Sequence, residues 1–398
     1  AFGNTATGFA GNVIVAIGAN PGGATLVGTV TVSAVSGVAT FSNLSLTSQG
    51  VGYTLVATSG ALTAATSSTF DITAQTLAWS NAAGGNWSNP SNWSLGRVPQ
   101  TTDSVVIALP GTYTVTLDTT FAAAFLTLGG ATGTQTLAIT SRTLTLSGAM
   151  AVRSSGVFAL SSSTVAGAGT VINQGTINSV ASTVNTALDN QGLLVVRGSS
   201  TVNGALMTAA GSTLRMEGNG TQGTGALTMA SGFTNTGAIE LTSVGSGFPA
   251  QLTVTSGTLV NASGGTFAVL AGAGGVRTLN AQLDNQGLLT LNAPLTLSRA
   301  SAAHSNSGTI DVSGGDWTLS QAGTTPSFTN TGTVTIGAGR TWAISSGTLN
   351  QNAGAIGGSG TLALTSVPAA NFTTNFTNAT TALVVNGSTL NGPGTLTN

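Results

Sequence analysis

The chain has 398 residues, of which eight are basic and nine acidic, so its net charge is −1. A nucleic-acid binder neutralises phosphates with clustered Lys and Arg, whereas every basic residue here is a scattered Arg, so we exclude nucleic acid as a partner. Cysteine is absent, which excludes disulfides, thiolate metal sites and cysteine nucleophiles. Hydrophobic residues still make up 41% of the chain, which is enough to bury a core.

The composition of the chain, rather than any export or membrane signal in it, points to a location outside the cell. No run of 18 apolar residues is present, so we expect no membrane-spanning helix, and no signal peptide is visible. The chain begins at Ala1 without Met, and we expect an export signal upstream of it. A surface of Thr, Ser and Asn without Cys fits extracellular repeat proteins of bacteria, so we expect an extracellular or cell-surface location.

Residues 1–75 are expected to form one β domain. Short apolar or alternating runs are separated there by Gly, Asn, Pro or Ser at intervals of roughly 8–12 residues, which is typical of a β-sandwich. The expected strands are Asn12–Ile17, Gly28–Val32, Val38–Phe41, Tyr53–Ala57 and Ser68–Ile72.

The same segment resembles the bacterial Ig-like domains that are repeated in large surface proteins. The resemblance lies in AFGNTATGF (Ala1–Phe9), VAIGANPGGATLVGT (Val15–Thr29), GVATFSNLSL (Gly37–Leu46) and GYTLVATSG (Gly52–Gly60). It implies an Ig-like β-sandwich. Such domains usually begin with one or two further strands, so we expect N-terminal strands to be missing here, either cut off before Ala1 or supplied by a neighbouring chain.

Residues 76–120 are expected to form a Trp-rich cap and the first coil of a solenoid. Trp79, Trp87 and Trp93 are three of only five Trp in the chain. Since Trp covers much apolar area, the three suit a lid over the open core end of a repeat stack. The pattern W…NWS…NWS followed by VP and D-x-V-x-I is similar to the segment that opens many bacterial β-solenoid passengers and haemagglutinin-like repeats. The alternative is an aromatic sugar-binding platform.

Residues 121–398 are expected to form a right-handed parallel β-helix with coils of roughly 22 residues. An N-x-G motif recurs between strand-like runs, with looser copies at Asn261 and Asn352, and one 45-residue step is expected to hide an unmarked coil near Leu214. Counting from residue 103, we expect around thirteen coils of three short strands each, stacked about 4.8 Å apart. The motif pairs are Asn173 and Gly175, Asn190 and Gly192, Asn235 and Gly237, Asn285 and Gly287, Asn306 and Gly308, and Asn330 and Gly332.

The repeated Asn and Gly are expected to form turns rather than to bind a ligand. Gly accepts a positive φ without penalty, and Asn tolerates the left-handed region. Asn side chains stacked in register can also form an amide ladder.

A search for chemistry finds no catalytic, cofactor or metal site. Asp189 and Asp284 share a motif position but are expected four coils apart, too far to act on one bond, and Asp311 and Asp316 are expected to be solvated. The single histidine, His304, is expected at the surface. Thr-x-Thr tracts raise an ice-binding possibility, which the uneven coil lengths are expected to break.

These patterns predict a protein that is not an enzyme and has no cofactor: a rigid extracellular stalk or filament component with a role in adhesion. The alternative is a carbohydrate-binding or polysaccharide-processing β-helix. Expected partners are copies of itself, neighbouring repeats of a larger chain, or a host or matrix glycan.

Overall fold

The computed structural model describes residues 5–73, 75–377 and 380–397, so the first four residues of the Ig-like resemblance lie outside the described part. The chain divides into two compact units. One comprises Ala1–Leu77 with Pro99–Val105, and the other Ala78–Val98 with Val106–Asn398. In the described residues the helical structure is a single 3₁₀ turn, Pro90–Asn92, and no helix there is long and apolar enough to cross a membrane.

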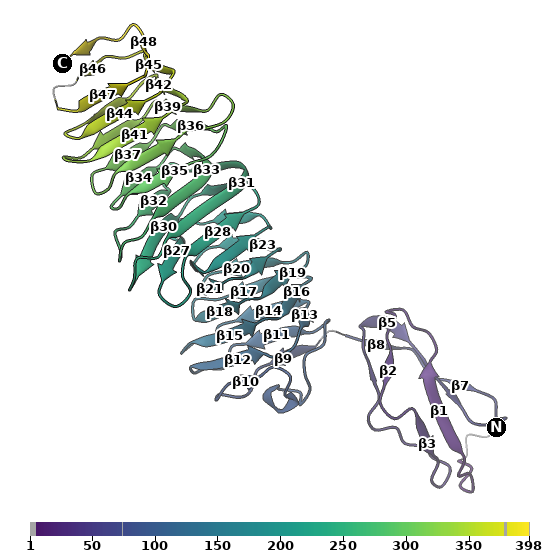
Figure 1. Cartoon of the computed structure of the whole chain (residues 1–398). Helices are drawn as coiled ribbons and strands as arrows, with labels where there is room; N and C mark the ends of the chain where they lie inside the picture. The colour runs from purple at the N-terminus through teal and green to yellow at the C-terminus, as the bar shows by residue number, and fades with distance from the viewer. Residues whose placement is uncertain (1–4, 74, 378–379, 398) are drawn as a thin grey trace. The chain divides into compact units, whose positions relative to one another are not determined.

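The N-terminal unit is built from short antiparallel strands (Figure 1). Its largest sheet has the order β3-β1-β6-β7, and two strand pairs, β2-β4 and β5-β8, complete it. The strands are β1 (Asn12–Ile17), β2 (Leu26–Val27), β3 (Thr31–Ser33), β4 (Ser45–Leu46), β5 (Gly50–Tyr53), β6 (Leu55–Thr58), β7 (Ala65–Thr66) and β8 (Phe70–Ile72).

The expected strand Val38–Phe41 is not formed, because Val38 makes only an isolated bridge to Val35. The core of the unit is small. Tyr53 is fully buried beside Leu46, its ring lies 6.1 Å from that of Phe70, and its hydroxyl donates to the Ser48 carbonyl over 2.9 Å. So few buried apolar residues predict a unit of low intrinsic stability.

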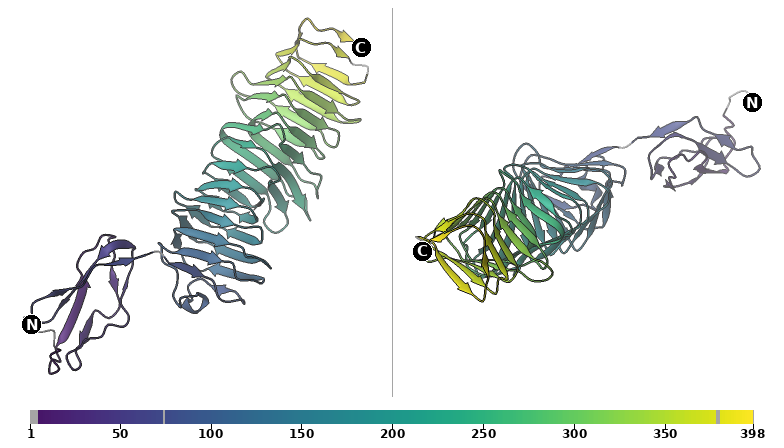
Figure 2. Two further views of the ribbon diagram at one scale, coloured as in Figure 1. Left: turned by 180° about the vertical axis from the view of Figure 1, so that it is seen from behind. Right: turned by 90° about the horizontal axis from the view of Figure 1, so that it is seen from above.

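The second unit is a parallel β-solenoid, as predicted. Each coil contributes strands to different faces, and every strand pairs in parallel with its equivalent in the neighbouring coils (Figures 1 and 2). The first face is a 13-stranded sheet, in agreement with around thirteen coils. Its strands are β10 (Gly85–Asn86), β12 (Tyr113–Leu117), β15 (Gln135–Thr140), β18 (Gly156–Ser161), β21 (Thr176–Val180), β24 (Leu193–Arg197), β27 (Thr213–Asn219), β30 (Ala238–Val244), β32 (Thr266–Val269), β34 (Leu288–Leu291), β37 (Thr309–Val312), β40 (Thr333–Ile336) and β43 (Ala355–Gly358).

The other two faces are separate in the first half of the solenoid and merge in the second half. The third face begins as a seven-stranded sheet of β9 (Thr76–Ala78), β11 (Ser104–Ile107), β14 (Phe125–Leu128), β17 (Met150–Val152), β20 (Thr170–Asn173), β23 (Ala187–Asn190) and β26 (Leu206–Thr208). The long strands β31 and β33 then run through the corner between the two faces, so both faces join one 19-stranded sheet.

This 19-stranded sheet carries the second face throughout and both merged faces from β29 onward. Its strands are β13 (Phe121–Ala123), β16 (Thr143–Leu146), β19 (Thr164–Ala166), β22 (Thr183–Val184), β25 (Ser199–Val202), β28 (Gly225–Met229), β29 (Phe233–Asn235), β31 (Ala250–Asn261), β33 (Arg277–Asn285), β35 (Leu295–Leu297), β36 (Ala303–Asn306), β38 (Trp317–Ser320), β39 (Ser327–Asn330), β41 (Thr341–Ser345), β42 (Thr348–Gln351), β44 (Thr361–Thr365), β45 (Ala369–Phe372), β47 (Ala382–Asn386) and β48 (Leu390–Asn391). The pair β46 (Phe376–Thr377) and β49 (Leu396–Thr397) follows.

Register along the first face places apolar side chains above one another in every coil. Because strand residues alternate between core and solvent, one inward column is apolar over twelve coils and the positions beside it face outward. The column is Val115, Leu137, Phe158, Ile177, Leu194, Leu214, Ile239, Phe267, Leu289, Ile310, Val334 and Ile356. All twelve are buried.

Differences in coil length are absorbed at the corners. The step between paired first-face residues is 17 residues from Thr176 to Leu193 and 28 residues from Ala238 to Thr266, yet the strands stay in register. The coil expected near Leu214 is confirmed, since Leu214 pairs with Leu194 in one neighbouring coil and Ile239 in the other.

The glycines of the N-x-G motifs do not have the left-handed backbone that we expected. None of the six has a positive φ. Their role is close approach instead: a Cβ on Gly175 would lie 2.2 Å from the Arg153 carbonyl oxygen, and one on Gly332 would lie 2.1 Å from that of Gly308. Gly is required because each corner packs directly on the backbone of the corner in the adjacent coil.

Gly308→Ala should therefore destabilise the solenoid by about 1–3 kcal/mol, because its Cβ would lie 2.2 Å from the Gly287 carbonyl oxygen. Gly264→Ala is the matched control, since a Cβ there meets nothing within 4 Å and the backbone is not left-handed. Urea unfolding followed by circular dichroism measures both variants. Equal midpoints for the two would contradict the close-approach explanation.

Candidate functional site

The Asn of each N-x-G motif ends the third-face strand of its coil and points into the core. Asn173, Asn190, Asn235, Asn285 and Asn330 are completely buried, and Asn306 is nearly so. Strand pairing sets several of them directly above one another, as in Asn173 with Asn190 and Asn306 with Asn330. They are thus interior residues at strand ends rather than surface turn formers.

Their amides form a hydrogen-bonded ladder. Asn173 Nδ2 donates to Asn190 Oδ1 over 2.7 Å, and Asn285 Nδ2 donates to Asn306 Oδ1 over 2.7 Å. Most of these amides also donate to a backbone carbonyl in the next coil, as Asn173 does to Leu193, whereas Asn330 donates to the Gly332 carbonyl of its own corner. The remaining steps are Asn235 to Asn261 (2.9 Å), Asn261 to Asn285 (2.8 Å) and Asn306 to Asn330 (2.7 Å).

The sequence pattern missed two members of this column. Thr208 occupies the position between Asn190 and Asn235, and its Oγ1 lies 3.3 Å from Asn235 Oδ1. Gln351 continues the ladder beyond Asn330, accepting from Asn330 Nδ2 over 2.8 Å. The motif spacing marks Asn352 instead, but register places Gln351 opposite Asn330.

Asn285→Ala should lower the free energy of unfolding by about 2–3 kcal/mol, because it leaves the side-chain Oδ1 of Asn306 without its donor inside the core. Asn280→Ala, on the outward side of the same strand β33, should change it by less than about 0.5 kcal/mol. Chemical denaturation of both variants gives the comparison. A loss at Asn280 as large as that at Asn285 would show that the ladder contributes nothing special.

The three predicted cap aromatics pack against one another beside β10, the end strand of the first face. Trp79 and Trp93 form an antiparallel bridge with ring centroids 5.0 Å apart, and Trp87 lies 4.8 Å from Trp93. Phe121 extends the cluster, 4.8 Å from Trp87. The Trp93 indole donates to the Trp87 carbonyl over 2.8 Å.

Burial of these rings does not fit the sugar-platform alternative. Trp79, Trp87 and Trp93 are each at most 2% exposed, so no ring face is free to stack on a sugar. The other two Trp, which the sequence pattern did not single out, stack face to face in the core: the rings of Trp317 and Trp342 lie 4.7 Å apart at 7°. The five Trp side chains of this protein therefore fill cores.

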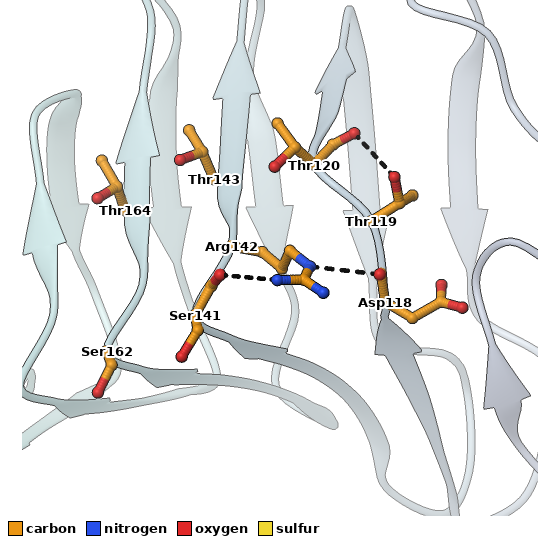
Figure 3. A pocket seen from close by; sticks show the side chains of 8 residues that line it. All are labelled: Asp118, Thr119, Thr120, Ser141, Arg142, Thr143, Ser162 and Thr164. Atoms are coloured by element: carbon orange, nitrogen blue, oxygen red, sulfur yellow. Dashed lines mark hydrogen bonds between the residues drawn. The ribbon is translucent and has the colours of Figure 1, made fainter.

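A polar groove of about 540 Å³ lies at the corner between the first and second faces, where three consecutive coils turn (Figure 3). It is lined by Asp118, Thr119, Thr120, Ser141, Arg142, Thr143, Ser162 and Thr164. Ser141 and Ser162 hold these corners with left-handed backbones, at φ 52° and 49°. In Figure 3, Arg142 reaches toward Asp118, and its Nε donates to the Asp118 carbonyl over 3.3 Å.

Both oxygens of the Asp118 carboxylate in this groove accept hydrogen bonds from Ser88 of the same chain. The Ser88 N–H donates to its Oδ1 over 3.0 Å and the Ser88 hydroxyl to its Oδ2 over 2.5 Å. Burial raises the pKa of Asp118, but these hydrogen bonds, its own backbone and the charge of Arg142 outweigh it, so the pKa lies below its usual value. A carboxylate held ionised by two hydrogen bonds is an anchor for the Ser88 turn, not a proton donor.

Asp189 and Asp284 lie far apart, whereas Glu217 and Glu240 lie on the adjacent strands β27 and β30 and are each ion-paired with an arginine, Arg197 and Arg215. Asp189 pairs with Met207 in the next coil. Counting back from Asp284, its partner in the preceding coil is Val260, and the partner of Val260 in the coil before that is Thr234. That order puts the two carboxylates four coils apart, or about 19 Å. A glycosidase needs two carboxylates within about 10 Å. In the part of the chain that the structure describes, no three His, Cys, Asp or Glu gather as a metal site.

We expected His304 at the surface, but its side chain is 2% exposed and lies in the core. Its strand register with Phe328 makes it an inward position, which the N-x-G spacing alone did not reveal. Its Nδ1 accepts from the Leu283 N–H over 3.1 Å, and its Nε2 has no partner. Burial lowers the pKa of His304 to about 4.

This buried imidazole makes stability depend on pH. The folded chain keeps His304 neutral down to about pH 4, whereas the unfolded chain binds its proton near pH 6.5. Stability should thus fall as the pH drops from 6.5 to 4, by up to about 3 kcal/mol. His304→Asn, which cannot titrate, should flatten the urea midpoint over this range. An unchanged pH slope in the variant would assign the dependence to other groups.

A column of outward threonines runs along the second face for six coils. Its members are Thr143, Thr164, Thr183, Thr201, Thr228 and Thr253. Our reason against an ice-binding array was wrong, because uneven coils do not disturb strand register. The column is nevertheless one residue wide: the adjacent outward position changes from Thr145 to Ala166 in the next coil.

Comparisons with known proteins assign this chain to no family. No family model matches the sequence, and no curated protein matches it. Among solved structures, the crystal structure of a TibC-catalysed hyper-glycosylated fragment of TibA is similar at 15% identity and a TM-score of 0.28, covering 81% of this chain and 98% of that one. So low a score supports no argument, and the fold rests on the strand pairing of this chain.

Proposed function

We propose that this chain is a structural part of an extracellular bacterial surface protein, serving as a rigid stalk or filament component with a role in adhesion. The observation that carries the proposal is the apolar core column that continues over twelve coils, with buried amide ladders from Asn173 to Asn190 and from Asn235 to Gln351. Thirteen coils spaced about 4.8 Å apart span about 60 Å, and backbone hydrogen bonds join each coil to the next. We expect such a stack to resist bending and proteolysis. We expect a right-handed coil.

We propose that the N-terminal unit is an Ig-like sandwich with an unfilled strand position. Its antiparallel sheets leave an open groove of about 540 Å³ lined by Val15, Phe41, Leu44, Leu55 and Ala57, among others. An extended strand with alternate apolar side chains would fill such a groove. We propose that a neighbouring repeat or another copy of the chain provides it, which would link units into an array.

We further propose that the chain has no catalytic activity. The separation of Asp189 from Asp284, the ion pairs that hold Glu217 and Glu240, and the anchored Asp118 support this, since polysaccharide cleavage requires a pair of carboxyl groups on one bond. The alternative, a carbohydrate-binding β-helix, is favoured only by the solvent-open grooves at the corners.

The test is made on intact cells of the source bacterium. Antibodies against residues 121–398 should label unpermeabilised cells, and external protease should remove the label while a cytoplasmic control protein stays intact. Labelling that requires permeabilisation would contradict the surface location.

The purified chain should also release no reducing ends from pectic, alginate or chitin polysaccharides. Clear cleavage, abolished by a substitution of one acidic residue, would overturn the structural assignment in favour of an enzyme.

A further inference from the structure

The polar groove at Arg142 continues into the column of outward threonines on the second face. Thr143 and Thr164 belong to both, because they line the groove and pair with each other at the start of the column. Thr120 lies in one row with them in Figure 3. The groove and the column therefore form one strip, which we call the threonine track. Its members are Thr120, Thr143, Thr164, Thr183, Thr201, Thr228 and Thr253.

The hydroxyls of the threonine track can be reached by a ligand. Thr120 is exposed, and the other six side chains are half-buried on the outward side of their strands. Thr253 accepts a hydrogen bond from Gln251 Nε2 over 3.1 Å. Within the described residues no other hydroxyl of the track has a partner in the protein, so each can both donate to a ligand and accept from it.

Arg142 provides fixed donors at the first end of the track. Its guanidinium is held by the backbone of two coils, because Nε donates to the Asp118 carbonyl over 3.3 Å and Nη1 to the Ser141 carbonyl over 3.1 Å. The side chain is exposed, and in Figure 3 its Nη2 donates to none of the residues drawn. A donor that is positioned before a ligand arrives loses little entropy when the ligand binds.

The charge of the track favours an uncharged ligand. Asp118 and Arg142 are the two charged residues that line the groove, so its net charge is zero. A charged ligand would be attracted by one of them and repelled by the other. Small side chains, Ala122, Thr145 and Ala166, occupy the outward position beside the track in three successive coils, so a flat ligand can lie against the hydroxyls.

The spacing of the track favours a linear sugar chain. Its hydroxyls follow one another at the coil spacing of about 4.8 Å, whereas an extended peptide repeats its side chains on one face about every 6.6 Å. A hexose ring in an extended chain is about as long as one coil is high, and every ring presents hydroxyls. The C–H groups of such a ring can pack on the alanine and threonine methyl groups.

We propose that the threonine track binds a linear neutral polysaccharide along the solenoid axis, with one ring per coil and the first ring at Arg142. Contacts that are weak singly add up when several coils engage one chain. This inference rests on the adhesive role proposed above and names its ligand class. It can fail by itself, because a rigid stalk needs no sugar on its second face, and the surface-labelling result does not depend on it.

The first test titrates the full chain with oligosaccharides of two, four and six rings from cellulose, chitin, mannan and β-1,3-glucan, followed by saturation-transfer difference NMR. In at least one series six rings should bind with a Kd below about 10 mM and at least about tenfold more tightly than two rings. Raising the salt from about 50 to 500 mM should leave this affinity unchanged. The proposal is overturned if no neutral series binds, if length has no effect, or if six-ring galacturonate binds more tightly.

The second test removes hydroxyls from the track. Thr164→Val with Thr183→Val deletes two consecutive hydroxyls, keeps the β-branched shape and should weaken six-ring binding at least about fivefold. Thr136→Val with Thr176→Val, at outward positions of the first face, is the matched control and should bind like the wild type. Equal binding by the two folded double variants would overturn the proposal.

The third test removes the fixed donors. Arg142→Gln should weaken six-ring binding at least about threefold, whereas Arg153→Gln, at an exposed arginine outside the track, should not. Urea midpoints show whether each variant is folded. Wild-type affinity in folded Arg142→Gln would contradict the placement of the first ring.

Discussion

In-register parallel pairing from coil to coil is the constraint on which this structure depends. It repeats every inward position at the strand spacing of about 4.8 Å, so a side chain meets its own equivalent above and below. An apolar residue then continues an apolar column, and a buried Asn finds the amide it needs in the next coil, as Asn261 does in Asn285. The same amide without register would be an unsatisfied polar group in the core.

The ends of each ladder reveal how strict that condition is. Asn173 has Val152 below it in register, and its Oδ1 is left without a partner. At the other end, Gln351 accepts from Asn330 and turns its own Nε2 to the Ala353 carbonyl over 2.6 Å, which satisfies the last amide locally. Beyond it the column becomes apolar at Phe372. The column therefore leaves one oxygen unpaired at its first member and satisfies its last member through the backbone.

The faces and the corners of the solenoid have different structural roles. The faces must keep register, so they carry the core, whereas the corners can lengthen without disturbing it. The corners range in length from the 321–326 loop to the two residues Ser346–Gly347, and the grooves lie at the corners. Variation in coil length, which in the sequence looks like imperfection of the repeat, is confined to the corners and leaves the pairing of the faces intact.

The sequence by itself determined the parallel coil, its period of roughly 22 residues and the hidden coil at Leu214, because period-2 patterning and a recurring N-x-G reflect local backbone needs. It did not reveal that His304 faces inward, that Gln351 rather than Asn352 joins the amide ladder, or that the motif glycines avoid a clash instead of taking a positive φ. Those outcomes depend on which residue stands opposite which in the next coil. That register is fixed only when the corners close, so the groove at Arg142, formed by three coils, belongs to the tertiary structure alone.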